Sequence, residues 1–271
     1  PVATKTNVGI FGNGRFFQTM LTHLYSEDLP EMQDIGTRAH AELDKIIPKF
    51  VKRAKRSEYF VETRKNMQAL AKRMVGDAPL ESNLESVILM KNGVDTTYVR
   101  DVIAQILFKY SHLSLPELRR NVASLSGEQQ QEIIQTYIGK RRNRFDRSGR
   151  ALEAGYPLTF NLRGDFGMYR DLHRHRMLTQ ERQLLTAQYN FIAPPILKEA
   201  GCEEDVQRCV TISRYLWEQI ANDVSPETAQ YAVLFGFPIQ FMMGMNIREA
   251  QHMLELRTGK QGHPAYREMC Q

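Results

Sequence analysis

Short runs of β-forming residues followed by helical periodicity occur twice along the chain. The first begins at Ser86-Val-Ile-Leu-Met90, after which Lys91-Asn92-Gly93 turns the chain and Asp95 can cap a helix. That helix would carry an apolar face made of Val99, Val102, Ile103, Ile106 and Leu107. The pattern predicts a strand, a turn and an amphipathic helix.

The second run extends from Tyr156 to Leu162, where apolar side chains stand at every second position from Leu158. Asp165 follows as a predicted N-cap, and the helix it starts would carry Tyr169, Leu172, Arg174 and His175. Because each run leads directly into a helix, we expect residues 86–90 and 158–162 to be neighbouring strands of one small sheet packed by long helices.

Helical signals dominate the rest of the chain. Ser126-Gly-Glu-Gln129 has the spacing of a capping box, and Ser225-Pro226-Glu227 is typical of a helix start. Amphipathic periodicity predicts further helices over residues 205–221 and 246–256. Many helices and few strands indicate an α+β fold, with a small mixed or antiparallel sheet wrapped by long helices.

The first 80 residues differ from the remainder. Residues 29–74 form a charged helical stretch, which Gly76-Asp-Ala-Pro79 then interrupts. We therefore predict two parts, a mostly helical segment over residues 1–80 and a domain over residues 84–271. Because the chain opens without an initiator Met, we also expect it to be a piece of something longer.

Composition narrows the functional classes. Of the 271 residues, 42% are hydrophobic and 25% are charged, close to the average for globular domains. The sequence contains no apolar run near the roughly 20 residues that a membrane helix needs, and no pattern in its first residues argues for secretion. Cys202, Cys209 and Cys270 lack the paired spacing of zinc sites or disulfide frameworks. We expect a cytoplasmic protein without a membrane partner or a metal.

The net charge of +5 indicates an anionic partner only weakly, because much of the excess lies in two clusters, Lys49 to Arg56 and Lys140 to Arg150. Solvated basic faces are the preferred explanation of such clusters, and a phosphate-bearing small molecule or RNA is the alternative. Arg174-His175-Arg176 places further cationic groups close together and would attract an anion, although a solvated surface is again the alternative.

Arg174-His175-Arg176 also resembles the Arg-His-Arg signature of flavin-dependent thymidylate synthases, the thymidylate synthase complementing proteins. Near the C-terminus, Asn246-Ile-Arg248 followed by Met253-Leu-Glu-Leu-Arg257 is similar to that family's ending. The strand at 86–90 and the helix around Arg100 resemble the family's opening elements. The order and spacing of all three agree over roughly residues 84–271.

The resemblance implies a function and a site. It implies methylation of dUMP to dTMP with methylenetetrahydrofolate and reduced FAD, in a homo-oligomer whose sites lie between subunits. Arg174, His175, Arg176 and Asn246 would contact the flavin, and Arg257 would be the catalytic residue that polarises the uracil ring. Nucleic acid would be an unexpected partner for such a protein.

The sequence departs from the family pattern where the nucleotide is bound. Leu184 and Thr186 stand in place of a serine and an arginine, and Gln230 stands where an arginine would bind the substrate phosphate. Residues 147–155 lack the family's His-Glu-Thr-Pro pattern. We expect this segment alone to be inactive, because each missing charged contact costs about 1.5–3 kcal/mol.

Residues 1–24 resemble the C-terminal element a second time. Asn13-Gly14-Arg15 matches Asn246-Ile247-Arg248, and Met20-Leu21 matches Met253-Leu254. Chance similarity between two amphipathic helices explains the match equally well. If the repeat is real, Asn13 is a second flavin-binding candidate and the chain is the divergent second half of a tandem duplication.

Three classes of function stay open from the sequence. The chain is a working flavin enzyme, a non-catalytic half that scaffolds or completes another half's site, or a basic nucleic-acid binder on the same fold. The dense run of Phe and Met over residues 235–245 indicates core or subunit interface rather than a cofactor site. We expect the chain to self-associate through helices carrying this run and through the helix predicted to carry Arg174.

Overall fold

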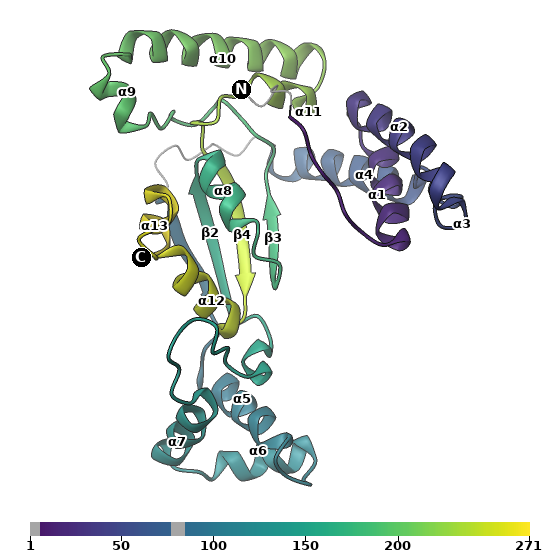
Figure 1. Ribbon diagram of the computed structural model, residues 1–271. Coiled ribbons are helices and arrows are strands. Elements are labelled where there is room, and N and C mark those ends of the chain that lie inside the picture. The colour runs from purple at the N-terminus through teal and green to yellow at the C-terminus, as the bar shows by residue number, and fades with distance from the viewer. Residues whose placement is uncertain (1–5, 77–84) are drawn as a thin grey trace. The chain divides into compact units, whose positions relative to one another are not determined.

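The computed structural model describes residues 6–76 and 85–271 (Figure 1). These residues fall into two compact units. The first unit combines residues 6–76 with Thr211–Val233, and the second combines residues 85–210 with Leu234–Gln271. The division predicted near residue 80 lies outside the described residues, as do most of the residues of the predicted break after Gly76.

The first unit is helical, as the charged stretch predicts. Its N-terminal helices are α1 (Gly14–Ser26), α2 (Pro30–Ile46), α3 (Pro48–Val51) and α4 (Glu58–Val75). Pro30 and Pro48 occupy first helical positions, where the missing N–H costs nothing. Leu21 and Val51 are fully buried between α1 and α3, which gives this unit a small core of its own.

The second segment of the first unit contains the end of α10 (Glu203–Asp223), then α11 (Pro226–Ala229) and the short 3-10 helix η2 (Gln230–Ala232). Ser225 caps α11, as predicted, by accepting a hydrogen bond from the Thr228 amide. The Tyr231 hydroxyl donates to the Glu31 carboxylate, and this hydrogen bond raises the pKa of Tyr231 to about 12.

The second unit contains, among its described residues, one four-stranded antiparallel sheet. Its strands are β1 (Val87–Asn92), β2 (Leu158–Gly164), β3 (Leu178–Arg182) and β4 (Ile239–Met245), in the order β1-β2-β4-β3. β1 and β2 are neighbours, with Val87 opposite Leu162 and Leu89 opposite Phe160, which confirms the predicted pair. The register of this pair shifts between Leu89 and Lys91.

β4 is the central strand and supplies much of the core. Phe241, Met243 and Met245 are each at most 3% exposed, and the Phe241 ring packs edge-to-face on Tyr169 at 5.2 Å. The prediction of a helix for the Phe and Met run over residues 235–245 was wrong. Residues 239–245 form β4, which pairs with β2 on one side and with β3 on the other. A strand buried on both faces has a continuous apolar sequence without alternation, so this run belongs to the core.

Four helices of this unit begin where the sequence predicts. Asp95, Ser126, Asp165 and Asn246 each accept a hydrogen bond from the amide three residues later. The helical elements are α5 (Thr96–Phe108), α6 (Leu115–Ala123), α7 (Gly127–Ile138), η1 (Arg150–Glu153), α8 (Phe166–Leu172), α9 (Pro195–Glu199), α12 (Ile247–Arg257) and α13 (Pro264–Cys270). No helix in the described part of the chain is long and apolar enough to cross a membrane.

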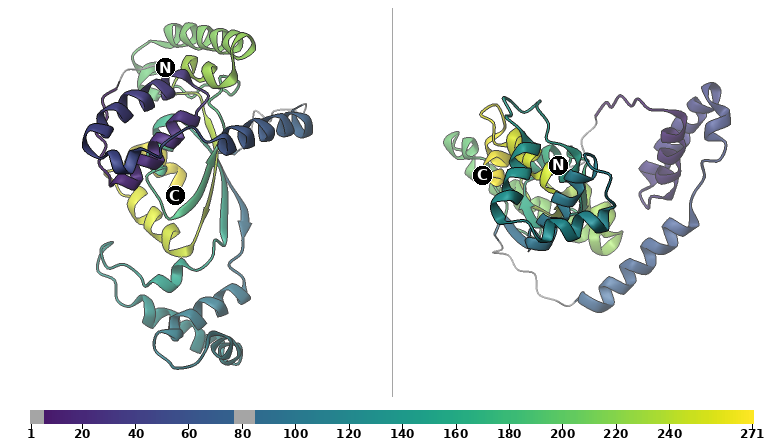
Figure 2. Two further views of the ribbon diagram at one scale, coloured as in Figure 1. Left: turned by 90° about the vertical axis from the view of Figure 1, so that its right-hand side faces the viewer. Right: turned by 90° about the horizontal axis from the view of Figure 1, so that it is seen from below.

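Helices α8, α12 and α13 lie on one side of the sheet (Figures 1 and 2). Their approach depends on Gly164 at the end of β2, since a Cβ atom there would lie 2.3 Å from the Met168 sulfur of α8 and 3.1 Å from the Met269 methyl of α13. α8 ends at Leu172, so the prediction that this helix carries Arg174 and His175 was wrong. The chain turns there because β3 must begin at Leu178 to pair with β4.

Replacing Met243 tests whether β4 is the centre of the core. We expect Met243→Ala to lower the free energy of unfolding by about 2–5 kcal/mol, because it leaves a cavity at a fully buried position. Met90→Ala on β1, where the side chain is 64% exposed, serves as the control and should change it by less than about 0.5 kcal/mol. Urea denaturation measures both, and equal losses would contradict the assignment.

Candidate functional site

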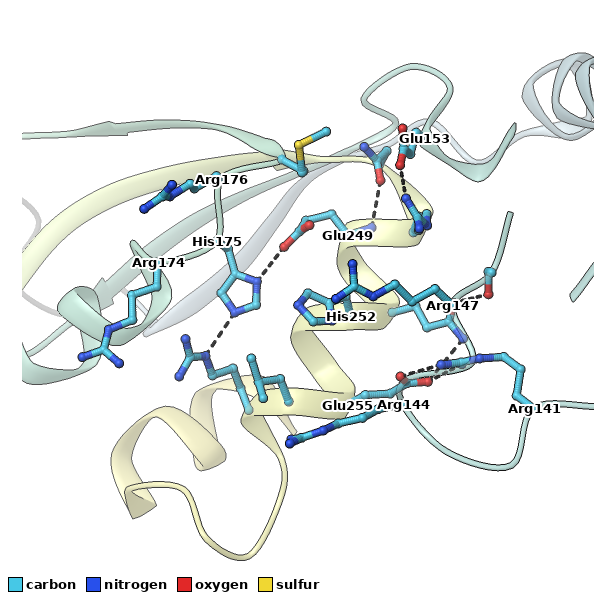
Figure 3. A pocket seen from close by; sticks show the side chains of 17 residues that line it. Arg141, Arg144, Arg147, Glu153, Arg174, His175, Arg176, Glu249, His252 and Glu255 are labelled. Atoms are coloured by element: carbon cyan, nitrogen blue, oxygen red, sulfur yellow. Dashed lines mark hydrogen bonds and ion pairs between the residues drawn. The ribbon is translucent and has the colours of Figure 1, made fainter. Parts of the chain in front are cut away.

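One pocket of about 570 Å³ lies within the second unit. Its walls come from the segment between α7 and η1, from the turn between α8 and β3, and from α12 (Figure 3). The lining contains seven arginines and three glutamates. The excess of guanidinium groups gives the pocket a positive electrostatic potential.

The turn after α8 brings Arg174, His175 and Arg176 to this pocket. His175 is buried, whereas Arg174 and Arg176 on either side are exposed. The backbone amide of His175 donates to the Leu172 carbonyl at 3.1 Å, which closes the turn. The triplet therefore separates into an inward-facing imidazole and two outward-facing guanidinium groups.

His175, Glu249 and Arg257 form a buried network, which we call the buried triad. Nδ1 of His175 lies 2.6 Å from Oε1 of Glu249, and Nε of Arg257 donates to Nε2 of His175 at 3.1 Å. Since Nε2 accepts from a guanidinium that cannot lose its proton, the imidazole is in the Nδ1–H tautomer and donates to the Glu249 carboxylate. All three residues are less than 9% exposed.

Arg257 is held by further contacts besides His175. Its Nη2 donates to the carbonyl of Asp171, and its guanidinium lies 5.3 Å from the ring centre of Tyr266 in a cation–π contact. The side chain still reaches the pocket wall. The predicted substrate-polarising arginine is thus fixed in position before any ligand arrives.

Asn246 lines the same pocket, at the junction of β4 and α12. It is 1% exposed, and its Oδ1 accepts from the Glu249 amide at 2.8 Å. Asn246, which the resemblance assigns to flavin binding, is therefore the N-cap of the helix that carries Glu249 and Arg257.

Two ion pairs join α12 to the chain after α7, one to the segment between α7 and η1 and one to η1 itself. Arg141 forms a bidentate pair with Glu255, and Arg248 pairs with Glu153. The hydrogen bond from Arg141 lowers the pKa of Glu255, while partial desolvation lowers the pKa of the adjacent His252. These contacts hold the arginine-rich segment against the helix.

Backbone and side-chain contacts shape that segment as well. The Arg142 amide donates to the Asp146 carboxylate at 2.7 Å, and the Ala151 amide donates to the Tyr137 hydroxyl at 3.1 Å. The loop is thereby closed on itself and anchored to α7. Arg144 and Arg147 project from it with exposed side chains.

The cations of the pocket differ in how they are paired. Among the described residues, Arg144, Arg147 and Arg176 have no carboxylate within ion-pair distance, and the pair of Arg174 with Asp171 is long at 3.5 Å and exposed. Arg141 and Arg248 are instead neutralised, by Glu255 and Glu153 respectively. Four exposed guanidinium groups are therefore available to an anion.

Three residues singled out in the sequence are not part of the pocket lining. Asn13 caps α1 in the first unit by accepting from the Phe16 amide at 2.9 Å. Gln230, also in the first unit, donates from its side chain to the Glu227 carbonyl at 3.1 Å. Thr186 accepts a hydrogen bond from the Gln188 amide at 3.1 Å.

Sequence reasoning missed several residues of the site. Glu249 could have been found, because a glutamate three residues after the capping Asn246 matches a capping-box pattern. The cluster from Lys140 to Arg150 suggested an anionic ligand only weakly and gave no location for it, although Arg141, Arg144 and Arg147 line the pocket. Among the described residues no three His, Cys, Asp or Glu side chains are grouped so that they could hold a metal ion.

Comparison with known proteins identifies the family to which the sequence is similar. The profile of the family described as thymidylate synthase complementing protein matches residues 112–271. A UPF0159 protein of Chlamydia muridarum is 35% identical over the whole chain, and UPF0159 protein Ta1429 of Thermoplasma acidophilum is 26% identical over 97% of it. The chain spans about half the length of these curated relatives, 52% of each.

A solved structure shares the fold. The UMP/dUMP methylase PolB from Streptomyces cacaoi, bound with 5-Br dUMP, superposes with a TM-score of 0.51 at 14% identity, over 68% of this chain and 86% of that one. The family profile covers more than half of the chain, including the turn at Arg174 and all of α12. The chain therefore belongs to the thymidylate synthase complementing protein family.

Proposed function

We propose that the arginine-lined pocket binds FAD, and that the protein in its full assembly methylates dUMP to dTMP with methylenetetrahydrofolate. The observation that carries this proposal is the set of four exposed guanidinium groups, on Arg144, Arg147, Arg174 and Arg176, around a pocket of ligand size. Family membership supports the same reaction class.

The pocket residues suit a dinucleotide diphosphate. Guanidinium groups bind phosphate oxygens through paired, charge-assisted hydrogen bonds. Arg174 and Arg176 lie on one wall and Arg144 and Arg147 on another, so a bridging anion could contact both (Figure 3). Reduced FAD, when bound, would supply the hydride that converts the transferred one-carbon unit to a methyl group, and a separate reductant would regenerate it.

Arg257 would act on the pyrimidine. A cation fixed near a uracil carbonyl stabilises negative charge on that oxygen, and this polarisation makes the ring carbon that receives the methyl group more nucleophilic. The buried triad would serve this task, because a prepositioned guanidinium loses little conformational entropy on binding. In this proposal Glu249 and His175 are positioning residues.

A non-catalytic role is the second candidate. Gln230 and Thr186, which stand where the resemblance calls for arginines, make local backbone hydrogen bonds, and neither lines the pocket. A chain that holds flavin but cannot hold the nucleotide phosphate would complete or scaffold the site of another half. Measuring flavin binding and dUMP binding separately distinguishes the two roles.

Flavin binding tests the main proposal. We expect Arg147→Ala and Arg176→Ala each to weaken FAD binding by about 1.5–3 kcal/mol, roughly 10-fold to 100-fold in Kd. Arg170→Ala is the matched control, because Arg170 is an exposed arginine close in sequence but outside the pocket lining. Isothermal titration measures all three, and equal affinities for every variant would refute the site.

Substitution of Glu249 tests the positioning role. Glu249→Gln removes the charge that His175 Nδ1–H contacts, and we expect it to lower the free energy of unfolding by about 1.5–3 kcal/mol. In the full assembly, which the proposal makes the active form, we also expect kcat for dTMP formation to fall by more than KM rises. Glu132→Gln on the exposed face of α7 is the control. A variant of normal kcat would show that Arg257 does not depend on the triad.

The 271-residue chain by itself should not form dTMP. Two absent phosphate-binding arginines would weaken dUMP binding by about two to four powers of ten, at roughly 1.5–3 kcal/mol each. The check is a dTMP assay with dUMP, methylenetetrahydrofolate, FAD and a reductant, together with calorimetric titration of dUMP. Turnover at ordinary enzymatic rates, or micromolar dUMP binding, would show that other residues replace the lost arginines.

A further inference from the structure

The segment that precedes α1 exposes apolar side chains. Val8 is 72% exposed, Ile10 is 54% exposed and Phe11 is fully exposed, although these residues are β-forming or aromatic. The segment belongs to no helix or strand and pairs with no strand among the described residues. It leads directly into Asn13, the N-cap of α1.

The same arrangement precedes α12, where an apolar strand leads into an asparagine cap. Asn13 has φ −83° and ψ 170°, and Asn246 has φ −85° and ψ 168°. Each side chain accepts from the amide three residues later, at 2.9 Å and 2.8 Å. The N-caps of α1 and α12 therefore have the same geometry, and the two helices that they begin are similar in sequence.

Aligning the two caps also aligns their surroundings. In α1, Arg15, Gln18 and Met20 correspond to Arg248, Gln251 and Met253 of α12. Upstream, Val8 and Ile10 correspond to Phe241 and Met243, the side chains that β4 buries at 2% and 0% exposure. These two positions are apolar in both segments, and Gly12 stands where β4 has the buried Met245.

We propose that Val8–Gly12 is the central strand of a second sheet of the β4 type, and that the strands beside it come from protein chain preceding residue 1. The length of the relatives supports additional protein chain as the source of these strands, because each relative is about twice as long as this chain. β4 needs a strand on each side, β2 and β3, and Val8–Gly12 has neither in the described chain. The inference rests on family membership and not on the proposed activity.

The alignment also predicts what the second sheet lacks. Phe16 stands where α12 has Glu249, and Leu24 stands where α12 has Arg257. Neither can take part in a buried charged network, so a site built around α1 would have no counterpart of the buried triad. The two halves of the longer protein would share a fold and differ in chemistry.

Hydrogen–deuterium exchange of the full natural chain tests the proposal, with the 271-residue chain measured alongside it. In the full chain we expect peptides covering residues 8–12 to exchange at least about 100-fold more slowly than in the 271-residue chain, and as slowly as peptides of β4. Fast exchange in both chains would overturn the proposal. Concentration-dependent protection in the 271-residue chain would also overturn it, because the partner would then be a second copy.

A substitution gives an independent readout. Ile10→Asp should lower the thermal midpoint of the full natural chain by several degrees, because it places a charge in a sheet core. In the 271-residue chain, where Ile10 is exposed, the same substitution should leave the midpoint unchanged. If Ile10→Asp prevents folding of the full chain, Ile10→Ala replaces it, and its effect should again be confined to the full chain. Equal effects in both chains would refute the second sheet.

Discussion

The hydrogen bonds between His175, Glu249 and Arg257 are the interaction on which the site depends. A buried ion is costly unless it is paired and its hydrogen-bonding groups are satisfied. Glu249 lies in the first turn of α12 and Arg257 in the last, so each charge also interacts favourably with the helix dipole. The imidazole between them fixes the turn after α8 against α12, and removing it would take from the buried Glu249 carboxylate the hydrogen bond that satisfies it.

The sequence indicated the strands that alternate and the helices that begin with a capping residue. β1, β2 and the caps at Asp95, Ser126 and Asp165 follow from local chemistry, which acts within a few residues. β4 was missed because a central strand has no polar face to produce a period of two. The end of α8 was misplaced because pairing between β3 and β4 sets it, and no local signal reports that pairing.

The site could be predicted in part, for a similar reason. Arg174, His175, Arg176, Asn246 and Arg257, the residues that the resemblance singles out, all line one pocket, while their roles in binding stay a prediction. Their division into buried and exposed groups depends on packing and could not be read from spacing. Gln230 and Asn13 lie in the first unit, where local hydrogen bonds account for their side chains.

The register shift in β1 has a consequence for solubility. β1 is an edge strand whose outer residues Leu89 and Met90 are exposed, and an exposed apolar edge is a template for uncontrolled strand addition. An irregular register, followed at once by the charged Lys91, breaks the flat row of backbone donors and acceptors that an incoming strand would need. Correcting that irregularity by design would make the chain more prone to aggregate, even if the corrected sheet were more stable.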